Sequence, residues 1–267
     1  MNEDVKVEDG RFKYGKRFFI YMPALKGRRY KSSGEFISKR IRNATAPFAP
    51  GQHPEKRQPF AWEYSVYYWW WEFLRRHDGY RDCCERGGKG RYKKLYADWG
   101  NIHAYTAETF WDWWSEKLDY GESRGEYLFA EPPLPRRITI ADKVAKDTQT
   151  LTVNLPLEIR TTELLKFMRK FLAENKARVR AARSISSARY PVAAKVRSAT
   201  LFQVLRVWDV EQEYGHLKTQ YEKSILAGIN RETKHFETME FRRNMKMAED
   251  YIHFAVADGT FPQRKAR

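Results

Sequence analysis

The chain has 267 residues, of which 42% are hydrophobic and 15% aromatic, and its formal net charge at pH 7 is +16. This length and composition are enough for the packed core of one large or two modest domains, which excludes a disordered chain. No apolar run approaches the roughly 18 residues of a membrane span, and the start Met1–Asp4 lacks the features of a secretory signal, so we expect neither a span nor secretion.

The charge is divided unevenly along the chain. Residues 1–60 carry a net charge of +8, residues 61–135 carry −3 and residues 136–267 carry +11, while the acidic middle holds eight of the nine tryptophans. Positive charge at both ends of an aromatic core is typical of a protein that binds a polyanion. We therefore expect nucleic acid as the partner, with a membrane surface as the competing alternative.

The first 60 residues are predicted to be a basic, partly ordered arm. A strand is expected over Arg17–Met22 and a short helix over about Glu35–Arg42. Four cations of this arm are candidate phosphate contacts along a groove of nucleic acid, namely Arg28, Arg29, Lys39 and Arg40.

Residues 61–135 are predicted to form an aromatic-rich helical domain that ends near Pro132–Pro135. In its first helix the apolar residues recur at spacings of three and four, at Val66, Trp70, Phe73, Leu74 and His77. The run Trp69–Trp71 allows a base-stacking platform, but consecutive helical residues point about 100° apart and the block is acidic. Packing in the core or between domains is the preferred interpretation.

Three further short helices are expected in this block. Asp78 is a candidate N-cap for the first, which ends at Gly87, and Gly100 ends the second. Thr106 is a candidate N-cap for the third, on which Phe110 and Trp113 face inward with Trp114.

Residues 136–267 are predicted to form a basic helical domain. A strand is expected over Leu151–Leu155, followed by a helix that begins at Thr161 or Thr162. The buried stripe of this helix is predicted to be Leu164, Met168, Phe171 and Leu172. A later helix over about 197–213 places Leu201, Val204, Leu205 and Trp208 on one side.

A basic connector lies between these two helices. Its cations are separated by small residues and almost unopposed by acids, which favours contact with phosphates over a merely solvated charge run. The candidates are Arg178, Arg180, Arg183, Arg189, Lys195 and Arg197.

The segment 217–258 has the layout of a helix-turn-helix. Leu217–Ala227 is a predicted helix, Gly228–Asn230 a tight turn in which Asn230 caps the next helix, and that helix runs to about Asp258. Its apolar face is predicted to hold Met245, Ala248, Ile252 and Ala255, leaving Arg242, Arg243, Asn244 and Lys246 to reach phosphates or base edges. A helical hairpin with a solvated face is the alternative.

Catalytic and metal-binding patterns are not found in the sequence. It has no Walker loop, no GxSxG, no HExxH and no pair of CxxC motifs. His77, Cys83 and Cys84 lack a fourth zinc ligand, and adjacent cysteines chelate poorly. We therefore expect a non-enzymatic cytoplasmic protein with no cofactor and no metal.

The run Trp71–Arg81 resembles a short motif, Trp-Glu-Phe-Leu-Arg-Arg…Tyr-Arg, of regulators of proteobacterial integrative and conjugative elements. In those proteins the motif accompanies a helix-turn-helix-like domain, which Leu205–Asp209, Ile225–Ile229 and Phe241–Arg243 resemble in pieces. The resemblance implies DNA binding in transcription or excision control, with Arg242, Arg243 and Asn244 as candidate contacts. The triple tryptophan, the cysteine pair and the basic arm depart from that pattern.

Together these patterns predict a mainly α-helical fold with few short strands. The expected function is that of a double-stranded DNA-binding regulator of a mobile element or phage, with RNA as the alternative nucleic acid and no membrane partner. The main rival is a structural nucleic-acid-binding subunit of a larger defence or phage complex, whose exposed aromatic block would contact a protein. A nuclease whose acidic residues the sequence does not reveal is the remaining rival.

Overall fold

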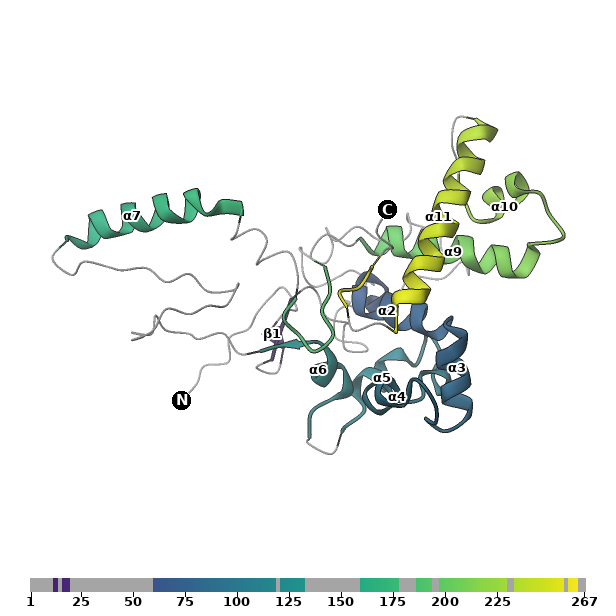
Figure 1. Ribbon diagram of the computed structural model, residues 1–267, viewed down its shortest axis with the longest axis horizontal. Coiled ribbons are helices and arrows are strands. Elements are labelled where there is room, and N and C mark those ends of the chain that lie inside the picture. Colours follow the sequence, from purple (N-terminus) through teal and green to yellow (C-terminus); the bar gives the residue numbers. More distant parts are fainter. Residues whose placement is uncertain are drawn as a thin grey trace, which may run out of the picture.

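The computed structural model describes residues 12–13, 16–19, 60–118, 121–132, 159–177, 186–193, 197–229, 233–256 and 259–263. Within these ranges the chain is mainly helical with a few short strands, which confirms the predicted fold class. Figure 1 shows helices α3, α4 and α5 below α2, helices α9, α10 and α11 above it, and α7 at a distance from both groups.

The elements follow one another in two groups and one separate helix. The aromatic part contains η1 (Ala61–Tyr64), α2 (Val66–Arg75), α3 (Asp78–Glu85), α4 (Lys93–Trp99), η2 (Ile102–Ala104), α5 (Phe110–Ser115) and α6 (Arg124–Phe129). The separate helix is α7 (Thr161–Glu174). The C-terminal part contains α9 (Ser198–Tyr214), α10 (Gln220–Leu226) and α11 (Lys234–Phe254).

A small antiparallel sheet joins the N-terminal region to the end of the aromatic part. Strand β2 (Lys16–Phe18) lies between β1 (Phe12–Lys13) and β3 (Ala130–Glu131). Phe18 pairs with Ala130 in register, is buried, and places its ring 5.8 Å from that of Trp114. The predicted strand therefore exists at its start, whereas residues 20–22, the predicted helix 35–42 and the predicted strand 151–155 lie outside the described residues.

Helix α2 is buried on all sides because each of its three consecutive tryptophans meets a different element. Trp69 contacts Phe202 of α9, Trp70 stacks on Phe261, and Trp71 packs against α5. A helix that is apolar around its whole circumference belongs in a core. The interpretation of these tryptophans as core residues is confirmed, and a stacking platform for single-stranded nucleic acid is excluded at this position.

Three details of the helix ends differ from the sequence-based expectation. His77 is not on the face of α2, since α2 ends at Arg75; instead its Nδ1 accepts the backbone N–H of Tyr80 and caps α3. Asp78 is therefore the first residue of α3 and not its cap. Helix α5 begins at Phe110 because Thr106 and Thr109 bond to each other in a turn that precedes it.

The aromatic part and the C-terminal part share one hydrophobic core. The buried cluster contains residues of α2, α4, α5 and α6 together with residues of α9, α11 and the segment 259–263. The indole N–H of Trp70 donates to the carbonyl of Ala255 at 2.9 Å, and its ring lies 5.0 Å from that of Phe261. The larger cluster therefore extends across the predicted boundary near Pro132, and a smaller second cluster lies within α9–α11.

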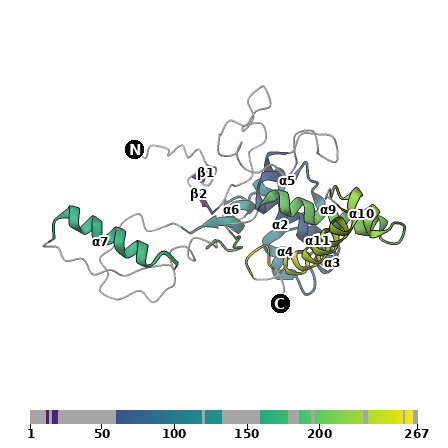
Figure 2. The same cartoon turned by 90° about the horizontal axis from the view of Figure 1, so that it is seen from above.

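Helix α7 is present where a helix was predicted, but its predicted buried stripe is wrong. No residue of α7 is buried: of the predicted stripe, Leu164, Met168 and Phe171 are only partly buried and Leu172 is 46% exposed. The reason is its position, because α7 stands apart from the other described helices in both views (Figures 1 and 2). Among the helices of the described ranges, none combines the length and apolarity needed to cross a bilayer.

Candidate nucleic-acid interface

Helices α9, α10 and α11 form a three-helix unit with a small core of its own. Val207 and Val210 of α9 pack with Ala227 and Ile229 after α10 and with Phe241 of α11. Lys223 of α10 is also buried there: its Nζ lies 2.8 Å from a carboxylate oxygen of Glu211, donates to a backbone carbonyl and faces the ring of Phe241. This cation therefore holds the unit together and is not available to a ligand.

Helix α10 is short, and its sequence fixes both ends. At its start Thr219 and Glu222 form a capping box, in which each side chain accepts the backbone N–H of the other residue. At its end Gly228 has a φ of 73°, and the N–H groups of Gly228 and Ile229 bond back to the carbonyls of Ile225 and Ser224. This pair of bonds is the Schellman motif, which explains the glycine at this position.

The connection from α10 to α11 is longer than the predicted tight turn. Seven residues, 227–233, separate the two helices, whereas a helix-turn-helix has a turn of three or four. Thr233 caps α11 by accepting the backbone N–H of Phe236, so Asn230 does not hold that position; residues 230–232 lie outside the described ranges. The unit is a three-helix arrangement with a helix-turn-helix-like order and a longer connection.

The exposed face of α11 carries the strongest candidate site. His235, Met239, Arg242, Lys246, Glu249 and His253 recur at spacings of three and four and are all exposed, and exposed Arg243 adjoins them. Nε of Arg242 donates to the side-chain oxygen of Gln220 on α10, at 2.5 Å. In the described part of the chain, Arg242, Arg243 and Lys246 form no ion pair, so this surface, which we call the α11 basic face, carries three unpaired cations beside the single carboxylate of Glu249.

Asn244 does not belong to the α11 basic face. It is buried at 6% exposure, so it cannot reach a base edge, and its proposed role in the interface is wrong. The buried residues Phe241, Ala248 and Ala255 recur in helical register with position 244, which places the amide toward the core. The predicted apolar face is confirmed at Ala248, Ile252 and Ala255, and its own spacing places position 244 on that face, four residues before Ala248.

Two cations of the basic connector, Arg189 and Arg197, lie within the described ranges, and they differ in their ion-pair partners there. The guanidinium of Arg189 makes two hydrogen bonds of 3.1 Å to the carboxylate of Asp98 and lies over the ring of Tyr127. Arg189 is therefore paired although its side chain is 52% exposed, and its role as a phosphate contact stays a prediction. Arg197 is exposed at the start of α9.

The remaining predicted contacts are in other segments. Arg178, Arg180, Arg183 and Lys195 of the connector, and Arg28, Arg29, Lys39 and Arg40 of the N-terminal arm, lie outside the described residues. They stay predictions, and the α11 basic face contains the largest set of predicted contacts that the structure brings together.

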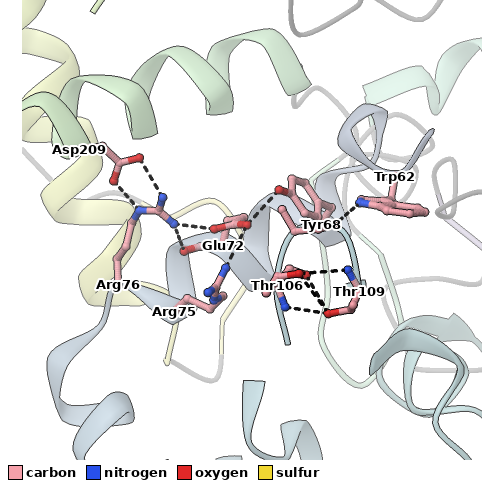
Figure 3. Close-up of polar contacts among 9 residues, drawn as sticks. Trp62, Tyr68, Glu72, Arg75, Arg76, Thr106, Thr109 and Asp209 are labelled. Atoms are coloured by element: carbon pink, nitrogen blue, oxygen red, sulfur yellow. Dashed lines mark hydrogen bonds and ion pairs between the residues drawn. The ribbon is translucent and has the colours of Figure 1, made fainter. Parts of the chain in front are cut away.

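A polar cluster between α2 and α9 was missed by the sequence reasoning (Figure 3). Arg76 donates to both carboxylate oxygens of Asp209, at 2.7 and 2.8 Å, and to a carboxylate oxygen of Glu72 at 2.6 Å. The other oxygen of Glu72 accepts from the hydroxyl of Tyr68 and from Arg75. The spacing of Glu72 and Arg76 is visible in sequence, but Asp209 lies 133 positions away.

This cluster is an ion-pair network and not an acid–base site. Burial acts to raise the pKa of Glu72, but Arg76 and Arg75 outweigh burial and hold that pKa below its ordinary value. Both carboxylate oxygens accept hydrogen bonds from neighbouring side chains and Glu72 is only 5% exposed, so a substrate does not reach this carboxylate. The network fastens α2 to α9 beneath the α9–α11 unit.

Burial makes the thiol of Cys84 a poor candidate for metal binding or nucleophilic chemistry. Cys83 and Cys84 are buried and unbridged, and burial together with the neighbouring Cys83 raises the pKa of Cys84 to about 11. A neutral thiol is a poor ligand and a poor nucleophile. Within the described ranges, no group of three His, Cys, Asp or Glu side chains is arranged to hold a metal ion.

No known protein family, curated protein or solved structure matches this chain. The resemblance of Trp71–Arg81 to the mobile-element regulators therefore stays a prediction. In the structure the apolar letters of that motif, Trp71, Phe73, Leu74 and Tyr80, are buried, so the motif describes packing around α2 and not a binding surface.

Proposed function

We propose that this protein binds double-stranded DNA through the α11 basic face, with phosphates as its main contacts. The observation that supports this is the difference in partners: Arg242, Arg243 and Lys246 lack acidic partners within the described ranges, whereas Arg76, Arg124 and Arg189 are paired with carboxylates. Unpaired cations on one helical face attract the phosphate backbone, and no carboxylate has to be separated from them before a phosphate binds.

The position of these cations on α11 favours phosphate contact over base reading. Helices that read bases in a helix-turn-helix do so mainly with their N-terminal residues, but Arg242 is the ninth residue of α11. Burial of Asn244 also removes the amide that would recognise adenine. We therefore propose binding that depends strongly on salt and weakly on sequence.

Duplex DNA is preferred to the other nucleic acids for two geometric reasons. Binding of single strands uses a series of exposed aromatic rings on which successive bases stack, and the tryptophans at positions 69–71, 99, 113 and 114 are buried in the core. Within the described α9–α11 unit, Phe236 is the one Phe, Tyr or Trp ring that is largely exposed, which is too few for such a series. The major groove of B-DNA is wide enough to admit an α-helix, so the cations of α11 can reach the phosphates on its two sides, whereas the deep, narrow major groove of A-form RNA does not admit a helix. We propose the cytoplasm as its location, where thiols such as Cys83 stay reduced.

The test is a triple variant, Arg242→Gln with Arg243→Gln and Lys246→Gln, in duplex-binding titrations at several salt concentrations. At about 0.1 M salt we expect affinity to fall on the order of 100-fold, and the log–log salt slope to become shallower by about 0.9 per lost phosphate contact.

The matched control removes the same charge from the aromatic part. Lys89, Lys93 and Lys94 are exposed near α3 and α4, and their triple glutamine variant should change affinity by no more than about twofold, because screened distant charges contribute little. Equal losses in both variants would show that net charge, and not the α11 basic face, governs binding.

A structural subunit of a nucleoprotein complex is the second candidate, although the aromatic block cannot be its interface because that block is buried. Instead, large apolar side chains are exposed on the α9–α11 unit, where they could contact a protein: Leu217, Ile225, Leu226, Phe236 and Met239. Duplex binding by the pure chain supports the first candidate. Insolubility of the pure chain that a copurifying protein relieves supports the second.

A further inference from the structure

Helix α7 is an amphipathic helix with an uncovered apolar face. At about 100° per residue its apolar side chains fall within an arc of about 160°. They are Leu164, Leu165, Phe167, Met168, Phe171 and Leu172. None of them is buried, and Phe167 is the most exposed of the larger ones at 56%. An apolar arc of this width needs a partner that offers an apolar layer.

The polar face of α7 carries three cations, Lys166, Arg169 and Lys170, and two acids, Glu163 and Glu174. Arg169 is exposed and has no acidic partner within the described ranges, whereas Lys166 and Lys170 face the two glutamates in exposed pairs. Such pairs contribute little and leave the lysines accessible. Lys176, two residues beyond the end of the helix, is also exposed. Directly after the helix, residues 175–188 contain Lys176, Arg178, Arg180 and Arg183 and no acidic residue.

We propose that α7 lies in the plane of an anionic lipid surface, with its apolar side chains between the headgroups and its cations on the lipid phosphates. Amphipathic helices with Phe and Leu on one face and Lys and Arg on the other bind in this way, and adjacent cations strengthen the attraction to anionic lipid. Long basic side chains extend along the interface while their charged ends stay at the headgroups.

Charge and chemistry favour this occupant over the alternatives. A second copy of the chain would bring together two molecules with a net charge of +16 each, which repel. Duplex nucleic acid would satisfy the cations of α7 but offers no apolar layer for Phe167 and Phe171. An anionic bilayer provides both. This inference is independent of the proposed function. It departs from the expectation, based on the sequence, that the protein has no membrane partner.

The test is flotation of the full chain with vesicles of phosphatidylcholine containing about 30% phosphatidylserine, and with vesicles of phosphatidylcholine alone. We expect binding to the anionic vesicles only. The variant Phe167→Gln with Phe171→Gln should reduce the bound fraction at fixed lipid by about tenfold or more, since two apolar anchors are lost. No residue of α7 is buried, so these changes leave the core intact.

A matched control changes the polar face of the same helix. Thr162 and Ala173 are exposed there, and Thr162→Gln with Ala173→Gln alters neither charge nor the apolar arc, so vesicle binding should stay within about twofold of the unmodified chain. The triple variant of the α11 basic face should float as the unmodified chain does, which separates this test from that of DNA binding.

Three outcomes would overturn the proposal. The unmodified chain could remain at the bottom of the gradient with anionic vesicles. The two phenylalanine substitutions could leave flotation unchanged, in which case charge alone holds the chain on lipid. Finally, sedimentation without lipid could reveal self-association that the same substitutions abolish, and the apolar face of α7 would then be an interface between copies.

Discussion

The arginines of the aromatic part and the cations of α11 have the same chemistry but opposite surroundings. The guanidinium of Arg76 forms ion pairs with Asp209 and Glu72. That of Arg124 pairs with Glu116 and donates to the backbone carbonyl of Asp98. On α11, Arg242 donates to neutral Gln220 and forms no ion pair with any residue of the described ranges.

This difference shows why a count of basic residues overstates a binding surface. A guanidinium that fastens two helices contributes to stability, and releasing it for a phosphate would leave a buried carboxylate without a partner. An exposed cation contributes little to stability and is free to act on a ligand. The two regions should therefore respond in opposite ways to loss of charge, in stability for the first and in binding for the second.

The largest effect is expected where the two regions share their core. Trp70 is fully buried, donates to Ala255 and stacks on Phe261, so Trp70→Ala should lower the free energy of unfolding by about 3–5 kcal/mol. Urea titration followed by far-UV circular dichroism measures this. Because one core serves both regions, we expect a single cooperative transition.

The control for this change is Trp111→Ala. Trp111 is only partly buried, at the edge of the core, and its loss should cost less than half as much. Two separated transitions in the unmodified chain, with Trp70→Ala moving only one, would contradict a shared core.

A smaller loss is expected from the ion-pair network. Arg76→Gln leaves buried Glu72 without its main partner, which should cost about 3 kcal/mol at neutral pH. Arg86→Gln is the control, because Arg86 pairs with Asp82 where both side chains are exposed, and its loss should cost about 0–1 kcal/mol. Similar losses in the two variants would show that burial adds nothing to the Arg76 pair.

The same pair predicts how stability depends on pH. In the unmodified chain the pKa of Glu72 is lowered by its arginines against the effect of burial, so its contribution is present above the ordinary carboxyl pKa of about 4.3 and is lost as pH falls through the lowered pKa. In Arg76→Gln, burial with less opposition should raise that pKa, so the variant gains a proton earlier and is penalised less in acid.

The difference in unfolding free energy between the two proteins should therefore shrink between about pH 7 and pH 4. Urea titrations at several pH values measure it. A difference in unfolding free energy that stays constant over this range would show that Arg76 does not control the pKa of Glu72.

The positions of the helices were predictable from the periodicity of their own apolar residues. Which of their faces are buried was less predictable, because burial depends on elements that are distant in the sequence. The spacing of Trp70, Phe73 and Leu74 predicted α2, but the neighbours that bury Trp69 and Trp71 come from α9 and α5, far away in the chain. Helix α7 shows the limit most clearly, since an amphipathic pattern predicts an apolar face and does not say whether anything covers it.

In the candidate site, too, exposure on a helix was predictable from sequence, whereas pairing with distant residues was not. The exposure of Arg242, Arg243 and Lys246 follows from the helical register and was predicted, whereas the pairing of Arg189 with Asp98 depends on a contact across 91 positions. The prediction for Asn244 failed because position 244 lies four residues before Ala248 and eleven before Ala255, on the buried stripe itself, whereas Met245 at its edge is only partly buried.

The smallest effect is expected at the cap of α10, the helix that supports the α11 basic face through Gln220. Thr219→Ala removes both bonds of its hydroxyl to Glu222, which should cost about 1 kcal/mol. Thr219→Ser keeps the hydroxyl and should be close to neutral. Because the capping box acts only on the first turn, the loss should appear as faster amide hydrogen exchange at Glu222, with the amides of α2 unchanged. If exchange in α2 rises equally, α10 does not open on its own, and its cap stabilises the whole shared core.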